Sequence, residues 1–187
     1  MLTPNQQKLI DQYIVLLKEY NEKVNVYSKS AYDKLPFHIQ DCLNLAELIG
    51  NKPIKVVDMG SGSGLPSVIL AIANNQNTIM AVESKAKKCE FLRHIQSELK
   101  LDKYRVINMD INEFIHQKAG QGQYYTAKAF GSFEKVEGIL TRGKIKNAQL
   151  FIPISGQQYQ ELDAVANKKY VLIKHQLDGF FYVRSGL

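Results

Sequence analysis

The sequence predicts an α/β protein with a mostly parallel, doubly wound sheet, and two observations favour this fold class. After Pro53, short apolar runs alternate with segments of helical periodicity, which is typical of parallel strands joined by helices. The first apolar run ends in an acid and leads through three glycines at alternate positions into a helical segment. We expect a single domain over residues 1–187, in which residues 1–50 form a helical cap and residues 51–187 form the α/β core.

Two helices are expected ahead of the first strand. The first begins at Thr3-Pro4-Asn5-Gln6, where an N-cap threonine, a proline in the first helical turn and a capping-box glutamine occur together. Apolar side chains then recur at helical spacing as far as Tyr20. The second helix is expected from about 32 to 49, with its leucine and isoleucine side chains facing inward. The polar residues around it are interpreted first as structural residues with satisfied hydrogen bonds: Asn21, Asn25, His38 and Asp41.

The elements of the core are expected to alternate along the chain. Strands are expected at 54–58, 78–83, 104–108, 124–128 and 148–152. Helices are expected at 65–73, 85–99 and 132–141, with a short turn at 110–116. Two last strands, at 169–174 and 179–184, would be joined through Asp178-Gly179 as an antiparallel pair.

Composition limits the function classes. Hydrophobic residues make up 45% and charged residues 22% of the chain, as in ordinary globular proteins. No apolar run is long enough to cross a bilayer and the N-terminus lacks a secretory signal pattern, so we expect a cytoplasmic protein without membrane contact. Cys42 and Cys89 are isolated, which argues against a disulfide framework and against a metal site. The net charge of +6 suits a polyanionic partner such as RNA.

The segment Asp58-Met59-Gly60-Ser61-Gly62-Ser63-Gly64-Leu65 indicates a cofactor site, because glycines let a ligand approach bare backbone. A dinucleotide fingerprint needs a small residue at the position that Leu65 occupies, so NAD is disfavoured. The pattern D-x-G-x-G-x-G is instead typical of Rossmann-like methyltransferases that bind S-adenosylmethionine. Glu83 ends the second strand, where an acid can accept hydrogen bonds from ribose hydroxyls. The alternative interpretation is that Glu83 caps the helix that begins near Ser84.

No catalytic side chain is predicted. Amino-group methyltransferases usually carry an Asp/Asn-Pro-Pro-aromatic loop after the fourth strand, where this chain reads Tyr125-Thr126-Ala127-Lys128-Ala129-Phe130. Methylation at a pyrimidine C5 needs a cysteine nucleophile, and neither cysteine stands in a suitable loop. A nitrogen with a free lone pair, such as N7 of guanine, needs neither this loop nor a cysteine nucleophile. The pattern therefore favours an enzyme that methylates such a nitrogen mainly by orienting it toward the methyl donor.

Basic residues cluster on the helix after Glu83, and they are candidates for RNA contact or for an ordinary solvated helix face. They are Lys85, Lys87, Lys88 and Arg93.

Four segments of the chain, combined, match the motifs of one known family. The segments are Leu17-Lys18-Glu19-Tyr20-Asn21, His38-Ile39-Gln40-Asp41-Cys42-Leu43, Val57 to Pro66, and Glu83-Ser84 with Lys87-Lys88 and Phe91-Leu92-Arg93. Over nearly its whole length the chain resembles ribosomal RNA small subunit methyltransferase G, also called glucose-inhibited division protein B.

This resemblance implies a Rossmann-like class I S-adenosylmethionine-dependent methyltransferase. Family members methylate N7 of one guanine in 16S ribosomal RNA, so the implied partner is the small ribosomal subunit, and we expect a monomer that uses no metal. The resemblance places Gly60, Gly62, Gly64, Leu65 and Glu83 around the cofactor, with Ile111 and Asn112 against its adenine and Lys128 at the mouth of the site. It adds His38 and Lys128 to the four basic helix residues as RNA-binding candidates.

Several positions depart from the family pattern. Phe37 and Lys128 stand where family members carry arginine, and Asn112 stands in place of glutamate. Asp110 replaces another arginine and Ser155-Gly156 replaces Lys-Gly, so the cofactor site is intact whereas the RNA-facing surface has diverged. Two alternatives stay open. The lost arginines favour a methyltransferase of a small molecule, while a non-catalytic RNA- or ribosome-binding module would not require intact glycines.

Overall fold

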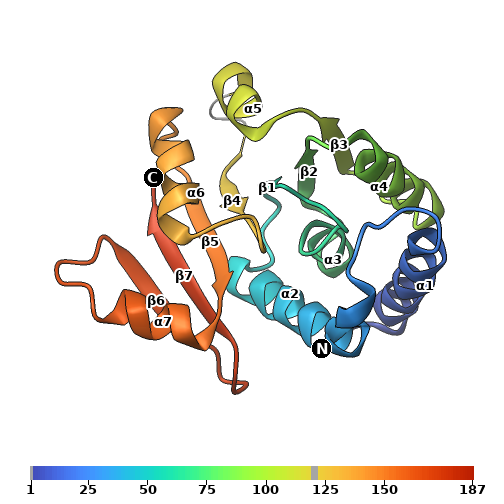
Figure 1. Ribbon diagram of the computed structural model, residues 1–187, viewed down its shortest axis with the longest axis horizontal. Coiled ribbons are helices and arrows are strands. Elements are labelled where there is room, and N and C mark those ends of the chain that lie inside the picture. Colours follow the sequence, from blue (N-terminus) through green and yellow to red (C-terminus); the bar gives the residue numbers. More distant parts are fainter. Residues whose placement is uncertain (1, 119–121) are drawn as a thin grey trace.

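The computed structural model describes residues 2–118 and 122–187, which form a seven-stranded sheet with helices on both faces (Figure 1). The strands are β1 (Lys55–Met59), β2 (Thr78–Glu83), β3 (Tyr104–Asn108), β4 (Tyr124–Thr126), β5 (Gln149–Ile154), β6 (Tyr170–Lys174) and β7 (Phe181–Gly186). Their order is β3-β2-β1-β4-β5-β7-β6. Strands β1 to β5 run parallel, and β7 is antiparallel to both β5 and β6. The predicted fold class, a mostly parallel doubly wound sheet, is confirmed.

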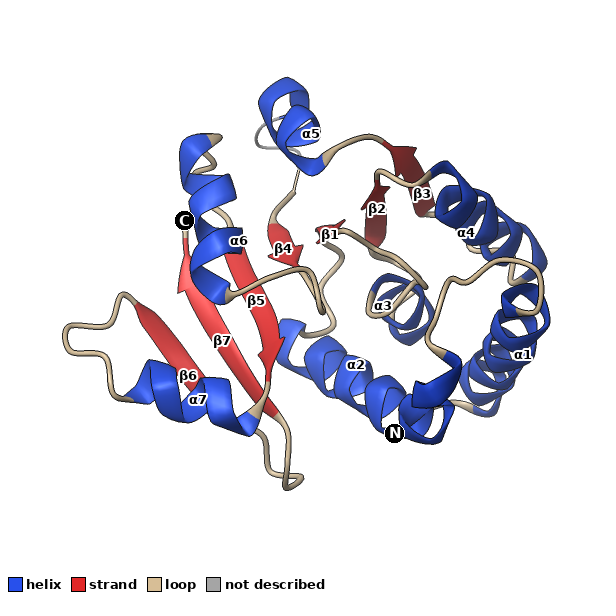
Figure 2. Ribbon diagram, in the orientation of Figure 1, coloured by secondary structure: helices blue, strands red, loops and turns tan. Residues whose placement is uncertain are grey.

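The helices are α1 (Pro4–Asn21), α2 (Leu35–Ile49), α3 (Ser67–Ala73), α4 (Ala86–Glu98), α5 (Ile111–Lys118), α6 (Phe133–Arg142) and α7 (Gly156–Asp163), with a 3₁₀ helix η1 (Lys29–Lys34) (Figure 2). Alternate residues of a strand face two separate hydrophobic clusters, since strand side chains point to opposite faces. Val56 belongs to the cluster with α1 to α4, and Val57 to the cluster with α5 to α7. The inner strands are therefore buried on both sides, as parallel strands usually are. Within the described ranges, no helix has the length and apolar character of a membrane span.

Helix α1 starts as its sequence predicts and is fastened to the core by its first turn. The Thr3 side chain accepts a hydrogen bond from the Gln6 backbone, and the Gln6 side chain accepts one from the Thr3 backbone. The amide of Gln6 then donates to the carbonyls of Ile72 at 3.1 Å and Ala73 at 2.9 Å. Since these carbonyls end α3, the capping box also docks α1 onto the helix that follows the glycine loop.

The single helix predicted at 32–49 is wrong at its beginning. The chain forms η1 first, and α2 starts only at Leu35. Pro36 lies in the first turn of α2, where its missing N–H is harmless, but it cannot donate to a preceding helical turn. A proline at this position therefore separates the two helices.

Two helices were not anticipated from the sequence. The turn expected at 110–116 is the helix α5, because the Asp110 side chain accepts a hydrogen bond from the backbone N–H of Asn112 at 2.8 Å and caps it. Helix α7 begins with a capping box in which Ser155 and Gln158 bond to each other's backbone. The spacing Ser-x-x-Gln is itself a signal for a helix start, so α7 could have been found from the sequence.

Candidate functional site

A cleft of about 800 Å³ opens at the carboxyl ends of the parallel strands, which is where open α/β sheets bind their ligands. Each strand end contributes to it: Gly60 follows β1, Glu83 ends β2, Met109 follows β3, Lys128 follows β4 and Ile154 ends β5. The volume lies toward the upper end of the range of about 300–1,000 Å³ for pockets that hold small organic ligands. The cleft is therefore large enough for a cofactor of nucleotide size.

The glycines of the loop after β1 have different neighbours. Gly62 has a φ of +54°, and a Cβ placed there would meet nothing nearer than the Gly60 carbonyl at 3.8 Å and the Lys88 Nζ at 3.9 Å. Gly62 thus presents bare backbone to open space in the cleft. A Cβ on Gly64 would lie 2.6 Å from the Val68 side chain, so Gly64 lets the loop pack closely on α3.

The carboxylate of Glu83 joins the glycine loop to the start of α4. Its Oε2 accepts a hydrogen bond from the Gly62 N–H, and its Oε1 accepts one from the Lys85 N–H, both at 2.9 Å. Lys85 is the N-cap residue of α4, so Glu83 does have the structural role near Ser84 that the sequence left open. Each carboxylate oxygen can accept a further hydrogen bond, so a ligand hydroxyl in the cleft still has an acceptor there.

Asp58 is a buried carboxylate of β1, two residues before Gly60. Its side chain is 0% exposed, and neither carboxylate oxygen has a hydrogen-bond partner among the residues that the structure describes. Burial raises the pKa of Asp58 to about 6, and the nearby Ser61 and Ser67 offset part of the rise. Above that pH Asp58 carries a buried negative charge, although it is not among the described residues that line the cleft.

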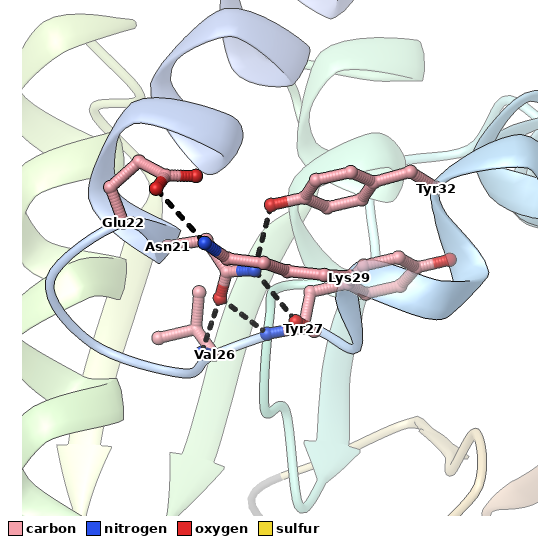
Figure 3. A network of polar contacts seen from close by, with 6 residues as sticks. All are labelled: Asn21, Glu22, Val26, Tyr27, Lys29 and Tyr32. Atoms are coloured by element: carbon pink, nitrogen blue, oxygen red, sulfur yellow. Dashed lines mark hydrogen bonds and ion pairs between the residues drawn. The ribbon is translucent and has the colours of Figure 1, made fainter.

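One wall of the cleft is supported by the cap helices. The Tyr13 hydroxyl of α1, fully buried, donates to the carbonyl of Ser63 in the glycine loop at 2.8 Å. Figure 3 shows the side chain of Asn21 at the centre of the loop that follows α1. Its amide nitrogen donates to the Tyr27 carbonyl and the Tyr32 hydroxyl, both at 2.7 Å, and its oxygen accepts from the N–H groups of Val26 and Tyr27. The structural role expected for Asn21 is confirmed.

That network places Tyr27 against His38 on the cleft wall. The Tyr27 hydroxyl and the His38 Nδ1 are 2.7 Å apart. Burial lowers the pKa of His38, the ammonium groups of Lys128 and Lys34 lower it further, and Asp41 opposes them. His38 is therefore neutral at pH 7 and presents an uncharged imidazole to the cleft.

Lys128 is held by Asp41, which Tyr182 holds in turn, and the sequence assigned neither of these two residues to the site. Its Nζ lies 2.5 Å from the Oδ2 of Asp41, and the Oδ1 of Asp41 accepts a hydrogen bond from the Tyr182 hydroxyl at 2.9 Å. Asp41 lies one helical turn after His38, so the spacing His-x-x-Asp was a signal for a shared face. Tyr182 lies far along the chain on β7, and no local pattern marks it.

The structure gathers most of the predicted site residues around the cleft. Those that line it are Gly60, Gly62, Leu65, Glu83, Lys85, Lys88, Ile111, Lys128 and His38. Four predicted site residues are not among the described residues that line the cleft: Gly64, Asn112, Lys87 and Arg93. The Asn112 amide donates to Asp110 at 3.0 Å in the cap of α5, and Arg93 borders a separate shallow hollow farther along α4.

Comparison with known proteins supplies the family. The family described as rRNA small subunit methyltransferase G matches residues 6–183. The chain belongs to this family. A ribosomal RNA small subunit methyltransferase G from Brachyspira hyodysenteriae is 34% identical over 79% of this chain and 71% of its own length. Another from Streptococcus sanguinis is 29% identical over 97% of this chain and 78% of its own length.

Solved structures share the fold of this family member at low identity. A methyltransferase from Geobacter sulfurreducens has a TM-score of 0.65 and 13% identity, covering 94% of this chain and 89% of its own. A mutant of MtNAS in complex with S-adenosylmethionine has a TM-score of 0.63 and 15% identity, covering 96% of this chain and 74% of its own. These likenesses establish the architecture of a Rossmann-like methyltransferase.

We predict that Asp58 makes the stability of the protein fall as the pH rises. Its pKa of about 6 in the folded protein exceeds the value of about 3.9 in an unfolded chain. Between these values the folded state retains a proton that the unfolded state releases, so the stabilisation present below about pH 4 is lost as the pH passes about 6. Asp58→Asn cannot ionise and should escape this loss.

The measurement is chemical denaturation of both proteins at about pH 4 and about pH 7. The free energy of unfolding of the wild type, relative to Asp58→Asn, should decrease by about 2 kcal/mol between these conditions. A difference between the two proteins that is the same at both pH values would contradict the prediction.

Proposed function

We propose that the chain transfers a methyl group from S-adenosylmethionine to N7 of a guanine in small-subunit (16S) ribosomal RNA. Its membership of the rRNA small subunit methyltransferase G family makes it a methyltransferase of small-subunit rRNA. The observation that carries the finer proposal is the make-up of the cleft. Bare glycine backbone and the buried carboxylate of Glu83 line the same cleft as Lys85 and Lys88, which suits a cationic cofactor beside a polyanionic substrate.

The residues of the cleft fit the cofactor. S-adenosylmethionine, when bound, supplies a methyl group on a positively charged sulfur. Gly62 leaves room against the backbone, and Glu83 retains acceptor capacity for ribose hydroxyls. Asp58, buried near the carboxyl end of β1, is ionised above about pH 6, and its negative charge favours a cationic ligand at that strand end. Leu65 and Ile111 add apolar lining, and Ile111 begins the helix whose first turn the resemblance assigns to the adenine.

Methylation at guanine N7 is supported because this reaction requires neither a general base nor a nucleophilic side chain in the cleft. The N7 atom has a free lone pair, so no proton has to be removed before it attacks. Cys42 and Cys89 are both buried, burial raises the pKa of both thiols, and neither is among the described residues that line the cleft. A cysteine nucleophile, which C5 methylation of a pyrimidine requires, has no candidate here. The remaining task is orientation of the base, which the fixed walls of the cleft can perform.

For the RNA grip, we propose that Lys85 and Lys88 contact phosphates at the rim, with Lys87 and Arg93 extending the basic surface along α4. Lys128 differs because its charge is paired with Asp41, so we assign it to positioning of the base together with His38. We also propose that the chain acts as a monomer on the small subunit. We place this reaction in the cytoplasm.

The direct test is methyl transfer from labelled S-adenosylmethionine to bulk small-subunit RNA and to small-subunit particles. We expect label in one or both, and 7-methylguanosine as the labelled nucleoside after digestion. Large-subunit RNA is the control and should stay unlabelled. Label in a different nucleoside would overturn the N7 assignment, and transfer only to small molecules would favour the alternative function.

A second prediction concerns the glycine loop that borders the proposed cofactor position. Gly62→Val should lower the affinity for S-adenosylmethionine by at least about 100-fold from a micromolar starting value, because it strains the positive φ and fills the open space. Gly50→Val is the matched control, since Gly50 has a φ of +90°, has no atom within 4 Å of an added Cβ and lies outside the cleft lining. Calorimetry should show loss of binding for the first variant alone. Equal affinity in both variants would refute this role of Gly62.

The third prediction separates affinity for RNA from affinity for the cofactor. Replacing Lys85 and Lys88 by glutamine should weaken RNA binding and reduce the slope of log affinity against log salt by about 1.5, because two phosphate contacts are lost. S-adenosylmethionine affinity should change little. The control replaces Lys144 and Lys146, two exposed lysines before β5 at the opposite end of the sheet. If both double variants show the same salt slope, the phosphates are bound elsewhere.

A further inference from the structure

Phe37 is an exposed aromatic ring at the mouth of the cleft. Five large hydrophobic side chains are exposed in the described part of the chain, and Phe37, at 48%, is the aromatic one among them. The other four are aliphatic and are absent from the described cleft lining: Val15, Val165, Val171 and Leu177. Single exposed aliphatic residues are common on protein surfaces. An exposed aromatic ring that lines a binding cleft calls for a different explanation.

The ring of Phe37 rests on a second, buried aromatic ring. Its centroid lies 4.6 Å from that of Phe180, and the two planes are inclined by 15°, so the rings are stacked. Phe180 is 8% exposed and also lines the cleft. Phe180 therefore covers one face of the Phe37 ring, while about half of Phe37 stays exposed to solvent.

Phe180 is a fixed support because the β6–β7 loop is fastened on both sides. The Phe180 carbonyl accepts a hydrogen bond from the His175 N–H at 3.0 Å. Two residues later, the Tyr182 hydroxyl donates to the carboxylate and to the carbonyl of Asp41, at 2.9 and 3.0 Å. Asp41 and Phe37 both belong to α2, so the helix that carries Phe37 and the loop that carries Phe180 are held together. The stacked pair is thus positioned before any ligand arrives.

The same cleft carries positive charge that is free of ion pairs. Lys85 and Lys88 line it, and neither forms a salt bridge with any residue that the structure describes. A flat apolar face and unpaired ammonium groups in one cleft match the two parts of an unpaired nucleotide, a base that stacks and a phosphate that is charged. A purely apolar ligand would leave the lysines without a role, and an isolated anion would leave the ring without one.

We propose that Phe37, backed by Phe180, stacks on an unpaired base of the RNA strand that the cleft binds. This inference rests on the proposed function and adds a contact residue that sets RNA affinity. Enzymes that modify a base take it out of its helix stack or act on single-stranded segments, and an aromatic side chain replaces part of the lost stacking. Phe37 contributes to binding of the RNA and not to binding of the cofactor.

The kinetic test compares Phe37→Ala, Phe37→Leu and Phe37→Tyr in methyl transfer to small-subunit RNA. Phe37→Ala should raise KM for RNA by about 5- to 150-fold, the range expected for loss of one base–aromatic stack. Phe37→Leu keeps an apolar side chain but has no flat π face, so it should behave like alanine, whereas Phe37→Tyr should stay near the wild type. Val171→Ala removes an aliphatic side chain of the same 48% exposure and should change nothing. Affinity for S-adenosylmethionine, measured by calorimetry, should be equal in all variants.

A spectroscopic test reports contact directly, because the chain contains no tryptophan. Phe37→Trp places a single indole on the proposed platform, and its emission should be quenched when small-subunit RNA is added with S-adenosylhomocysteine present. Val171→Trp is the control and should keep its emission. Both readings are taken at RNA concentrations that saturate binding in a separate filter assay.

The outcomes distinguish this inference from the function on which it rests. If the wild type methylates RNA but Phe37→Ala and Phe37→Leu keep its KM, the stacking proposal is overturned and the function stands. If Phe37→Leu alone matches the wild type, apolar contact and not stacking is responsible, which also overturns the proposal. Unchanged emission of Phe37→Trp with saturating RNA leads to the same conclusion. If the wild type transfers no methyl group to any RNA, the proposed function itself fails.

Discussion

The site depends on keeping a loop of bare backbone rigid without placing side chains in front of it. Positive φ angles and missing Cβ atoms make the Gly60–Gly64 segment accessible, but the same properties would leave it flexible in isolation. Hydrogen bonds from outside the loop remove that freedom. The Glu83 carboxylate binds the Gly62 N–H from β2, and the Tyr13 hydroxyl binds the Ser63 carbonyl from α1. A ligand then meets donors and acceptors that are already in place, so less ordering entropy is lost on binding.

The second support of the cleft is a set of polar contacts between α2 and the C-terminal half of the sheet. Asp41 is 5% exposed and interacts with both Lys128 and Tyr182, so its charge is paired and hydrogen-bonded as a buried carboxylate requires. Breaking such a pair by removing one partner leaves a buried charge, which is strongly destabilising. These contacts join the cap helices to β4 and β7. The cap is consequently part of the binding site and does more than cover hydrophobic surface.

The cleft combines chemically different groups. The glycine loop and Glu83 present backbone and a carboxylate, and Lys85 and Lys88 lie close to them, with the Lys88 Nζ 3.9 Å from a Cβ placed on Gly62. The Phe37 ring comes from α2 and adds an apolar face. A cofactor with a positive sulfur and an RNA strand with negative phosphates would each find complementary groups in this cleft. Phe37 and Lys128 stand at positions where the sequence resemblance leads one to expect arginine. An aromatic ring and lysines can bind a nucleotide through stacking and charge in place of the bidentate contacts of guanidinium groups.

The sequence by itself determined the sheet, most of its strands and the glycine loop. These features depend on neighbours in the chain: alternation of apolar residues, the spacing of three glycines, and the position of Glu83 at the end of β2. The expected boundaries differ from the structure where a single residue changes the local preference, such as Pro36 in the first turn of α2 or Asp110 at the start of α5. Helix α7 begins with a capping box, which is a local signal that the sequence does contain.

Only the tertiary structure decided which residues share the cleft. The bond between Tyr182 and Asp41 joins residues 141 positions apart, and the stack of Phe37 on Phe180 likewise joins α2 to the last hairpin. The sequence placed Lys87 and Lys88 together, yet the helix brings Lys88 into the cleft lining and leaves Lys87 outside it. Periodicity shows which face of an element is apolar, but it does not show which other element will cover that face. Long-range packing makes that choice, and in this protein it builds half of the binding site.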